Sequence, residues 1–162
     1  MKKDIIPTID ISSILKNNFN SKKSINTINQ ICRACVDIGF FQVIGHGLSF
    51  KDIKKICKVG NKFFKSSKDN KRKLSPKKWN NKNKNLYRGY FPNDVNGKEG
   101  LDIGDLKVTK NYSLKLNNQY IEYLNLNKSF DKKSIKIIEK YFDSIFELSE
   151  TLFKSIIKIY KK

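Results

Sequence analysis

The chain has 162 residues, of which 38% are hydrophobic and 12% aromatic, a composition typical of one globular domain with a buried core. No apolar run approaches the roughly 18 residues that a membrane span needs, and Asp4 lies too early for a secretory signal. The formal net charge of +19 comes almost entirely from lysine. These features exclude a membrane-spanning protein and a chain disordered throughout, and they predict a soluble cytoplasmic protein.

The first third of the chain predicts two short strands around a helix. The first strand is expected at residues 6–11. Apolar residues at three- and four-residue spacing predict an amphipathic helix from Ile25 to Val36, which Gly39 ends. The β-rich run from Phe40 to Ile44 predicts the second strand, and Gly45-His46-Gly47 predicts a turn.

A second helix and a basic loop are expected next. Ser49 is the candidate N-cap of this helix, whose apolar face is formed by Phe50, Ile53, Ile56, Cys57, Phe63 and Phe64. A basic segment at about residues 66–86 contains Pro76 and an Asn-rich run, which favour a solvated loop.

The last third predicts one long helix at about residues 131–160. Its apolar positions repeat at helical spacing from Ile135 to Tyr160, and Asp131 or Ser129 is the candidate N-cap. The apolar stripe is wide, and any part of it that nothing covers would form an exposed patch that drives association. Sustained heptads with charge pairing are missing, which argues against a coiled coil.

Two motifs carry a resemblance to a known family. The order of IPTIDIS at residues 6–12, a helix, ACVDIGFFQVIGHGLS at residues 34–49 and a second helix ending in two phenylalanines resembles the N-terminal region of the non-haem iron dioxygenases of the isopenicillin N synthase type. The segment RGYFPNDVNGKEGLDIGDLK, from Arg88 to Lys107, is similar to the one that follows in bacterial members.

The downstream Asn118-Gln119-Tyr120 is similar to the family's Asn-Gln-Trp. The sequence departs from the family at Val108, where Glu is usual, and at Tyr120-Ile121, where Trp-Pro is usual.

The resemblance implies an α+β fold: the helical and strand region that precedes a jelly-roll barrel, with the barrel itself missing. Members of the family oxidise a small organic substrate with O₂, Fe(II) and usually 2-oxoglutarate, and two His and one carboxylate hold the iron. The chain contains one histidine. We therefore expect the N-terminal portion of an oxygenase that is inactive alone, whose partner is the missing C-terminal jelly-roll domain and whose two short strands pair with strands of that barrel.

The resemblance also implies one place where this chain approaches substrate. Arg88 would hold a substrate carboxylate through a bidentate pair, and Tyr90 would add a hydroxyl contact or line the pocket. The alternative is that Arg88 is a surface residue whose aliphatic stem lies on Tyr87 or Tyr90. No catalytic, cofactor-binding or metal-binding residue is expected in the chain.

The one histidine and the three cysteines could have structural roles or could take part in redox chemistry or zinc binding. His46 is expected to have a buried or turn-bonding role, since the resemblance places it outside the iron site. Cys32 and Cys35 lie late in a helix, which favours core packing over redox chemistry. A zinc site formed by Cys32, Cys35, Cys57 and His46 is the minor alternative, because the spacing matches no compact zinc finger.

Two other functions remain open from the sequence. A degenerate oxygenase half could bind a partner protein through its long helix. The charge also suggests nucleic-acid binding through the segment from Lys68 to Lys84, where Trp79 could stack on a base. Against this, only three of the 34 basic residues are arginine, namely Arg33, Arg72 and Arg88, and the abundance of Lys, Asn and Ile follows from an A- and T-rich genome.

Overall fold

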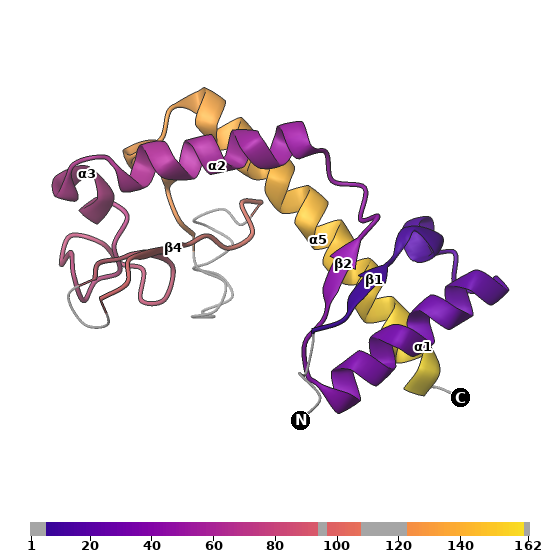
Figure 1. Ribbon diagram of the computed structural model, residues 1–162. Helices are drawn as coiled ribbons and strands as arrows, with labels where there is room; N and C mark the ends of the chain where they lie inside the picture. Colours follow the sequence, from indigo (N-terminus) through magenta and orange to yellow (C-terminus); the bar gives the residue numbers. More distant parts are fainter. Residues whose placement is uncertain (1–5, 94–96, 108–122, 161–162) are drawn as a thin grey trace. The chain divides into compact units, whose positions relative to one another are not determined.

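The computed structural model describes residues 6–93, 97–107 and 123–160, and the chain divides into two compact units (Figure 1). The first unit comprises the residues up to Ser49 and those from Asp143 onward, and the second comprises Phe50–Phe142. The described residues contain helices and two small sheets and no closed barrel. The prediction of a single domain over residues 1–162 stays a prediction.

The first unit is built on a parallel strand pair. β1 (Thr8–Asp10) pairs with β2 (Gln42–Ile44), with Ile9 opposite Val43. The sequence places both strands correctly but two to three residues too long. Within the described residues the two strands pair with each other, and their expected pairing with strands of a barrel stays a prediction.

Local side-chain geometry closes the turn after β2. The backbone N–H of Ser12 donates to Oδ1 of Asp10 at 2.9 Å, and a Cβ on Gly45 would lie 2.3 Å from that oxygen. Gly45 also has a φ of +66°, which side chains disfavour. Only glycine therefore fits between the end of β2 and the loop after β1. Downstream, the N–H of Leu48 donates to Nδ1 of His46 at 3.1 Å, which confirms the turn-bonding role expected of this histidine.

Two helices cover the strand pair. The short 3₁₀ helix η1 (Ser12–Asn17) leads to α1 (Lys22–Asp37), where Ser21 Oγ accepts from the N–H of Ser24 at 3.0 Å as the N-cap. Gly39, with a φ of +83°, ends the helix as predicted, and its N–H donates to the Ala34 carbonyl at 2.9 Å. The buried core of this unit consists of Ile9, Ile11, Ile14, Ile28, Ile31 and Ala34.

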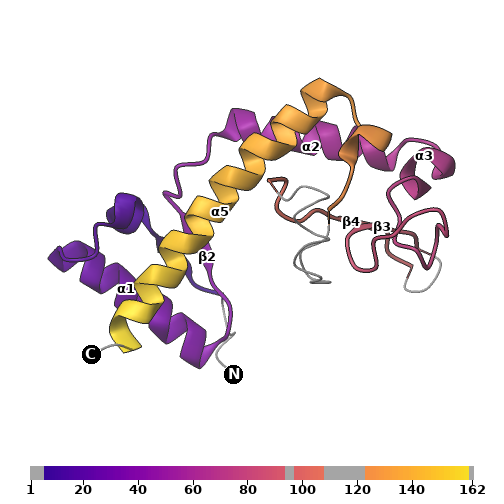
Figure 2. The ribbon, with the colours of Figure 1, turned by 180° about the vertical axis from the view of Figure 1, so that it is seen from behind.

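The C-terminal part of α5 (Lys132–Tyr160) packs on the same core through Leu148, Leu152 and Ile156. Figure 2 shows this part of the helix beside α1. The long helix is confirmed, and Asp131 is its N-cap, because Oδ1 of Asp131 accepts from the N–H of Ser134 at 2.7 Å. This bond, together with Lys62, lowers the pKa of Asp131 to about 2.

The second unit contains α2 (Phe50–Phe64), α3 (Lys68–Arg72), the 3₁₀ turn η2 (Leu126–Lys128) and the start of α5. Its sheet is an antiparallel hairpin of β3 (Gly89–Phe91) and β4 (Gly100–Asp102). The rings of Phe63 and Phe130 stack at the centre of this unit, with centroids 4.9 Å apart. Its buried core consists of Val59, Phe63, Leu74, Tyr90, Leu126 and Ile138.

The expectation of a solvated loop over residues 66–86 is wrong for part of the segment, although many of its residues, among them Lys77, Lys78 and Lys82, are exposed. The segment contains α3 and buries Leu74, Ser75 and Pro76. Its carbonyls are satisfied from within, since Nδ2 of Asn83 donates to the oxygens of Lys73 and Ser75 at 3.0 and 2.6 Å. The Asn83 amide therefore takes the place of the solvent water that would hydrogen-bond these carbonyls in an exposed loop.

Several apolar stripe positions are exposed, contrary to the helical patterns. Val36 of α1 is 74% exposed and Phe50 of α2 is 69% exposed. Cys35, expected in the core, is also exposed.

Trp79 is half-buried, and its ring centroid lies 5.5 Å from that of Phe91. The predictions for Val108, Asn118-Gln119-Tyr120 and Ile121 concern residues outside the described ranges. No helix of the described residues is long and apolar enough to cross a bilayer.

The core of the first unit makes a direct prediction about stability. Ile31 is 0% exposed, so Ile31→Ala should lower the free energy of unfolding by about 2–5 kcal/mol through lost burial and a cavity. Val36→Ala on the same helix should change it by less than about 0.5 kcal/mol. Urea unfolding followed by far-UV circular dichroism measures both. Equal losses would contradict the described core.

Candidate functional site

The β3–β4 hairpin carries both residues for which the sequence predicts a substrate contact, Arg88 and Tyr90. The approach of the hairpin to the preceding loop requires glycine at position 89. The N–H of Tyr90 donates to the Leu74 carbonyl at 3.2 Å, and a Cβ on Gly89 would lie 1.9 Å from that carbonyl oxygen. The Gly of the Arg-Gly-Tyr motif is thus the contact point at which β3 meets the chain after α3.

Arg88 lies at the start of the hairpin and is half-buried. Its Nη1 donates to Oδ1 of Asp102 at 2.6 Å, and Asp102 is opposite Gly89 in the strand register. A Cβ on Gly104 would lie 3.1 Å from Nε of Arg88, so the missing side chain gives the guanidinium its space. Asn85 holds the backbone here by donating to the Arg88 carbonyl. The structure therefore places Arg88 in an ion pair across the hairpin.

Tyr90 points into the core of the second unit and is 4% exposed. Its ring meets Phe63 edge-on, with centroids 5.8 Å apart. Its hydroxyl donates to Oε2 of Glu99 at 2.7 Å. The phenol is thus both a core side chain and a member of a polar cluster.

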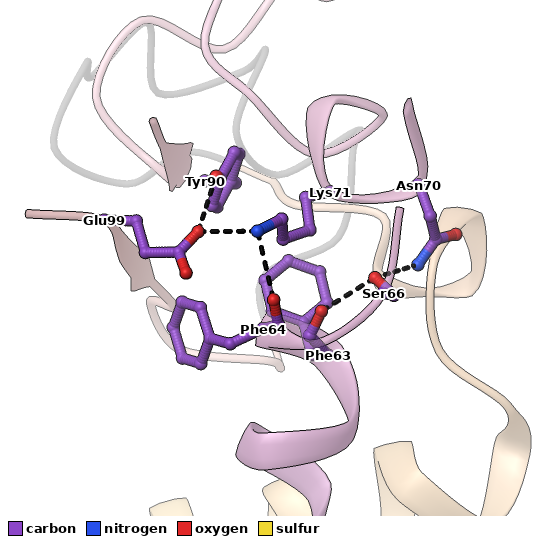
Figure 3. Close-up of polar contacts among 7 residues, drawn as sticks. All are labelled: Phe63, Phe64, Ser66, Asn70, Lys71, Tyr90 and Glu99. Atoms are coloured by element: carbon purple, nitrogen blue, oxygen red, sulfur yellow. Dashed lines mark hydrogen bonds and ion pairs between the residues drawn. The ribbon is translucent and has the colours of Figure 1, made fainter. Parts of the chain in front are cut away.

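Lys71 completes this cluster from α3 (Figure 3). Its Nζ donates to the same Oε2 of Glu99 at 2.7 Å and to the Phe64 carbonyl at the end of α2 at 3.0 Å. The Lys71 side chain is 10% exposed and that of Glu99 33% exposed. The Glu99 carboxylate therefore joins α3 to β3 through two short hydrogen bonds, and Lys71 extends the cluster to the end of α2.

The cluster shifts the titration of each member. Hydrogen bonds from Lys71 and then Tyr90 hold the pKa of Glu99 below its ordinary value. The bond to Glu99 raises the pKa of Lys71, although burial acts the other way. Burial, with the bond to Glu99, raises the pKa of Tyr90. At neutral pH the cluster is therefore an ammonium, a carboxylate and a neutral phenol.

Sequence reasoning named Arg88 and Tyr90 and missed Lys71 and Glu99. Lys71 is one of many lysines in a basic run, and no local pattern distinguishes it from its exposed neighbours. Glu99 carries a weak signal, because it is the one acidic residue between Phe91 and Gly100 apart from Asp94. What identifies both is the register of a hairpin that the sequence did not predict.

A cavity of about 270 Å³ lies near this cluster, between α2, α3 and the start of α5. Its polar lining groups bond to one another. Oγ of Ser66 donates to the Phe63 carbonyl, Asn70 donates to Ser66, and Lys62 pairs with Asp131 at 3.0 Å. With its polar groups engaged in this way, the cavity gives no specific sign of a ligand.

The described residues also offer no metal centre. No group of three or more His, Cys, Asp or Glu side chains in the described ranges lies close enough to hold an ion. Cys32, Cys35 and Cys57 are free thiols, and burial, with Cys35 nearby, raises the pKa of Cys32. A raised pKa leaves the Cys32 thiol protonated and poorly reactive at neutral pH.

Comparison with known proteins gives a match over most of the chain. A family model described as the non-haem dioxygenase in morphine synthesis N-terminal matches residues 6–132. This range includes β1, the helices α1 and α2 on either side of the Gly45-His46-Gly47 turn, and the whole β3–β4 hairpin.

Several curated proteins are also similar. The 2-oxoglutarate-dependent dioxygenase tropC of Talaromyces stipitatus is 33% identical over 89 residues, which are 55% of this chain and 26% of that protein. The homoarginine-6-hydroxylase 2-ODD-C23.2 of Arabidopsis thaliana is 35% identical over 44% of this chain and 22% of its own length. Feruloyl CoA ortho-hydroxylase 2 of Arabidopsis thaliana is 26% identical over 90% of this chain and 40% of its own length.

The partly buried cluster of Lys71, Tyr90 and Glu99 predicts a pH-dependent stability. Glu99→Gln should lower the free energy of unfolding at neutral pH by about 1–3 kcal/mol, because Lys71 loses its charged partner. The pKa of Glu99 is lower in the folded chain, so its contribution is full above the unfolded value near 4.5 and is lost as the pH falls through the folded value. Urea titrations at neutral and acidic pH should therefore show a difference between variant and parent that shrinks in acid.

The matched control is Glu150→Gln, which removes an exposed carboxylate that pairs with Lys154 at 3.3 Å on α5. Such a pair contributes little, so this variant should resemble the parent at both pH values. A loss in Glu99→Gln that is the same at both pH values would argue against a charged Glu99 in the folded chain.

Proposed function

Because the chain belongs to the non-haem dioxygenase family, whose N-terminal region it matches, we propose that it is the N-terminal portion of an Fe(II)- and 2-oxoglutarate-dependent oxygenase of a small organic substrate. The match over residues 6–132 carries this proposal. Relatives named as 2-oxoglutarate-dependent dioxygenases support the choice of cosubstrate. The chain covers only 22–40% of the length of the three relatives described above.

The residues of this chain do not fit the iron site of such an enzyme. That site uses two histidines and one carboxylate and leaves coordination positions open for the reactants. The chain has one histidine, His46, and its Nδ1 already accepts the N–H of Leu48. We assign the iron and the 2-oxoglutarate to a C-terminal jelly-roll domain outside these 162 residues, and we expect these residues to be inactive alone.

The part of this chain in the proposed enzyme is to support the barrel and shape the substrate entrance. Arg88 is the proposed substrate contact, because a guanidinium binds a carboxylate through two parallel hydrogen bonds. Its side chain is 29% exposed, so solvent and solutes reach it. Tyr90 lies two residues after Arg88, in β3, but it is 4% exposed and its hydroxyl donates to Glu99, so its part in the proposed enzyme is to hold the hairpin. The free cysteines support a location in the reducing cytoplasm.

A second candidate function is binding to a partner protein, and one observation favours it. Phe146 and Phe153 lie seven residues apart on one side of α5 and are 55% and 69% exposed. A chain that is soluble and monodisperse by itself favours this function. A chain that aggregates favours the oxygenase portion, whose apolar surface needs the rest of the enzyme.

Iron binding tests the proposed assignment of the chemistry. Anaerobic titration of the purified chain with Fe(II), followed by oxygen uptake with 2-oxoglutarate, should show neither stoichiometric binding nor turnover. Full-length tropC in the same assay controls for active reagents, and His46→Ala identifies any weak binding at the histidine. Stoichiometric iron with turnover would contradict the proposal.

Substitution of Arg88 tests the substrate contact. In the complete protein, Arg88→Ala should raise KM for a carboxylate substrate about tenfold to a hundredfold, as expected for the loss of a charge-assisted hydrogen bond. Arg72→Ala, at an exposed arginine of α3, is the matched control and should leave KM unchanged. Unchanged substrate affinity in Arg88→Ala would exclude the contact.

A further inference from the structure

The cluster around Glu99 and the proposed substrate contact lie at the two ends of the same hairpin, because Gly89 is opposite Asp102 and Phe91 is opposite Gly100. Arg88 immediately precedes β3, and its partner Asp102 ends β4. Glu99 immediately precedes β4, and Tyr90 is the central residue of β3. The cluster and the Arg88–Asp102 pair therefore use the same two strands.

The cluster fixes both strands to the helices of the second unit. Tyr90 and Glu99 bond to each other at 2.7 Å, which closes the hairpin at the side-chain level. Lys71 then ties Glu99 to α3 and, through the Phe64 carbonyl at 3.0 Å, to the end of α2 (Figure 3). A displacement of Glu99 would thus move the strand on which the Arg88 partner lies.

Two glycines, Gly89 and Gly104, make close approaches around Arg88. On one side, Gly89 meets the Leu74 carbonyl without room for a Cβ. On the other, the guanidinium lies over Gly104, where a Cβ would approach Nε to 3.1 Å. The backbone beside Arg88 is therefore closely packed, and the ion pair of Arg88 with Asp102 depends on the register of the hairpin.

We propose that Lys71 and Glu99 are positioning residues, which hold the β3–β4 hairpin against the ends of α2 and α3 and thereby set the place of the Arg88 guanidinium. This inference rests on the proposed function, in which Arg88 contacts substrate. Neither residue touches the substrate in this account. Their effect passes through Tyr90 and the strand register.

A purely structural role gives a different expectation. If the Lys71–Glu99 pair only contributed stability, its loss would make unfolding easier but leave Arg88 in place in the folded molecules. A positioning role requires that Arg88 change its surroundings while the chain is still folded. The environment of the guanidinium is therefore the quantity to measure.

Nuclear magnetic resonance of arginine side chains measures it directly. The chain has only three arginines, so ¹⁵N-labelled arginine gives three Nε–H signals, which single substitutions assign. Asp102→Asn shows where the Arg88 signal moves when its partner loses charge. In Glu99→Gln and Lys71→Met the Arg88 signal should move in the same direction and its Nε–H should exchange faster with water. The signals of Arg33 and Arg72 should stay in place.

The matched control is again Glu150→Gln, which removes a carboxylate from an exposed ion pair and should move none of the three signals. If Glu99→Gln or Lys71→Met fails to fold, Tyr90→Phe replaces them, since it removes one hydroxyl and keeps the core ring. An Arg88 signal that stays in place in the folded variants would overturn the inference, even if they unfold more easily.

This outcome is separate from the test of the proposed function. The arginine signals need neither iron nor 2-oxoglutarate. An unmoved Arg88 signal overturns the positioning role and leaves the oxygenase assignment intact. Turnover by the isolated chain overturns that assignment and leaves the arginine result standing.

Discussion

The second unit depends on a carboxylate that is shared by two donors. Glu99 lies between an ammonium and a phenol, and a single oxygen of its side chain accepts from both. Partial burial strengthens these bonds, and it also makes any unpaired member costly. Because Lys71 and Tyr90 come from different elements, the carboxylate accepts both hydrogen bonds only when α3 and the hairpin are both formed. The polar cluster thereby selects one arrangement of segments that apolar packing alone would hold less specifically.

The first unit is stabilised differently, by close packing of its apolar core and by hydrogen bonds at the ends of its helix. Its core is almost entirely isoleucine, and β1 and β2 supply each other with backbone partners. Ser21 and Gly39 define the two ends of α1, and the buried Ser24 hydroxyl donates to the Ser13 carbonyl at 2.8 Å. Small polar groups here complete the hydrogen bonding of a core whose stability comes from apolar burial.

Local features of the fold could be predicted from the sequence, because they depend on residues close in the chain. The end of α1 at Gly39, the strand after it and the long helix that begins at Asp131 all follow from periodicity and capping. The Arg-Gly-Tyr motif also named two residues of the hairpin that carries the polar cluster. Lys71 and Glu99 could not be found in this way, since they are 28 residues apart and meet only through the hairpin. The buried segment after α3 was missed for the same reason: the amide of Asn83 satisfies its carbonyls from eight to ten residues away.

The position of the one tryptophan determines which part of the chain its fluorescence monitors during unfolding. Trp79 lies edge-on against Phe91 of β3, and Lys78 lies 4.8 Å from the centre of its ring. Intrinsic fluorescence therefore senses the hairpin and its surroundings, while the isoleucine core around α1 is spectroscopically silent at that wavelength. Backbone circular dichroism follows the helices of both units together. Denaturation curves from the two signals would coincide only if the units unfold as one cooperative block, so the pair of curves measures the coupling between them.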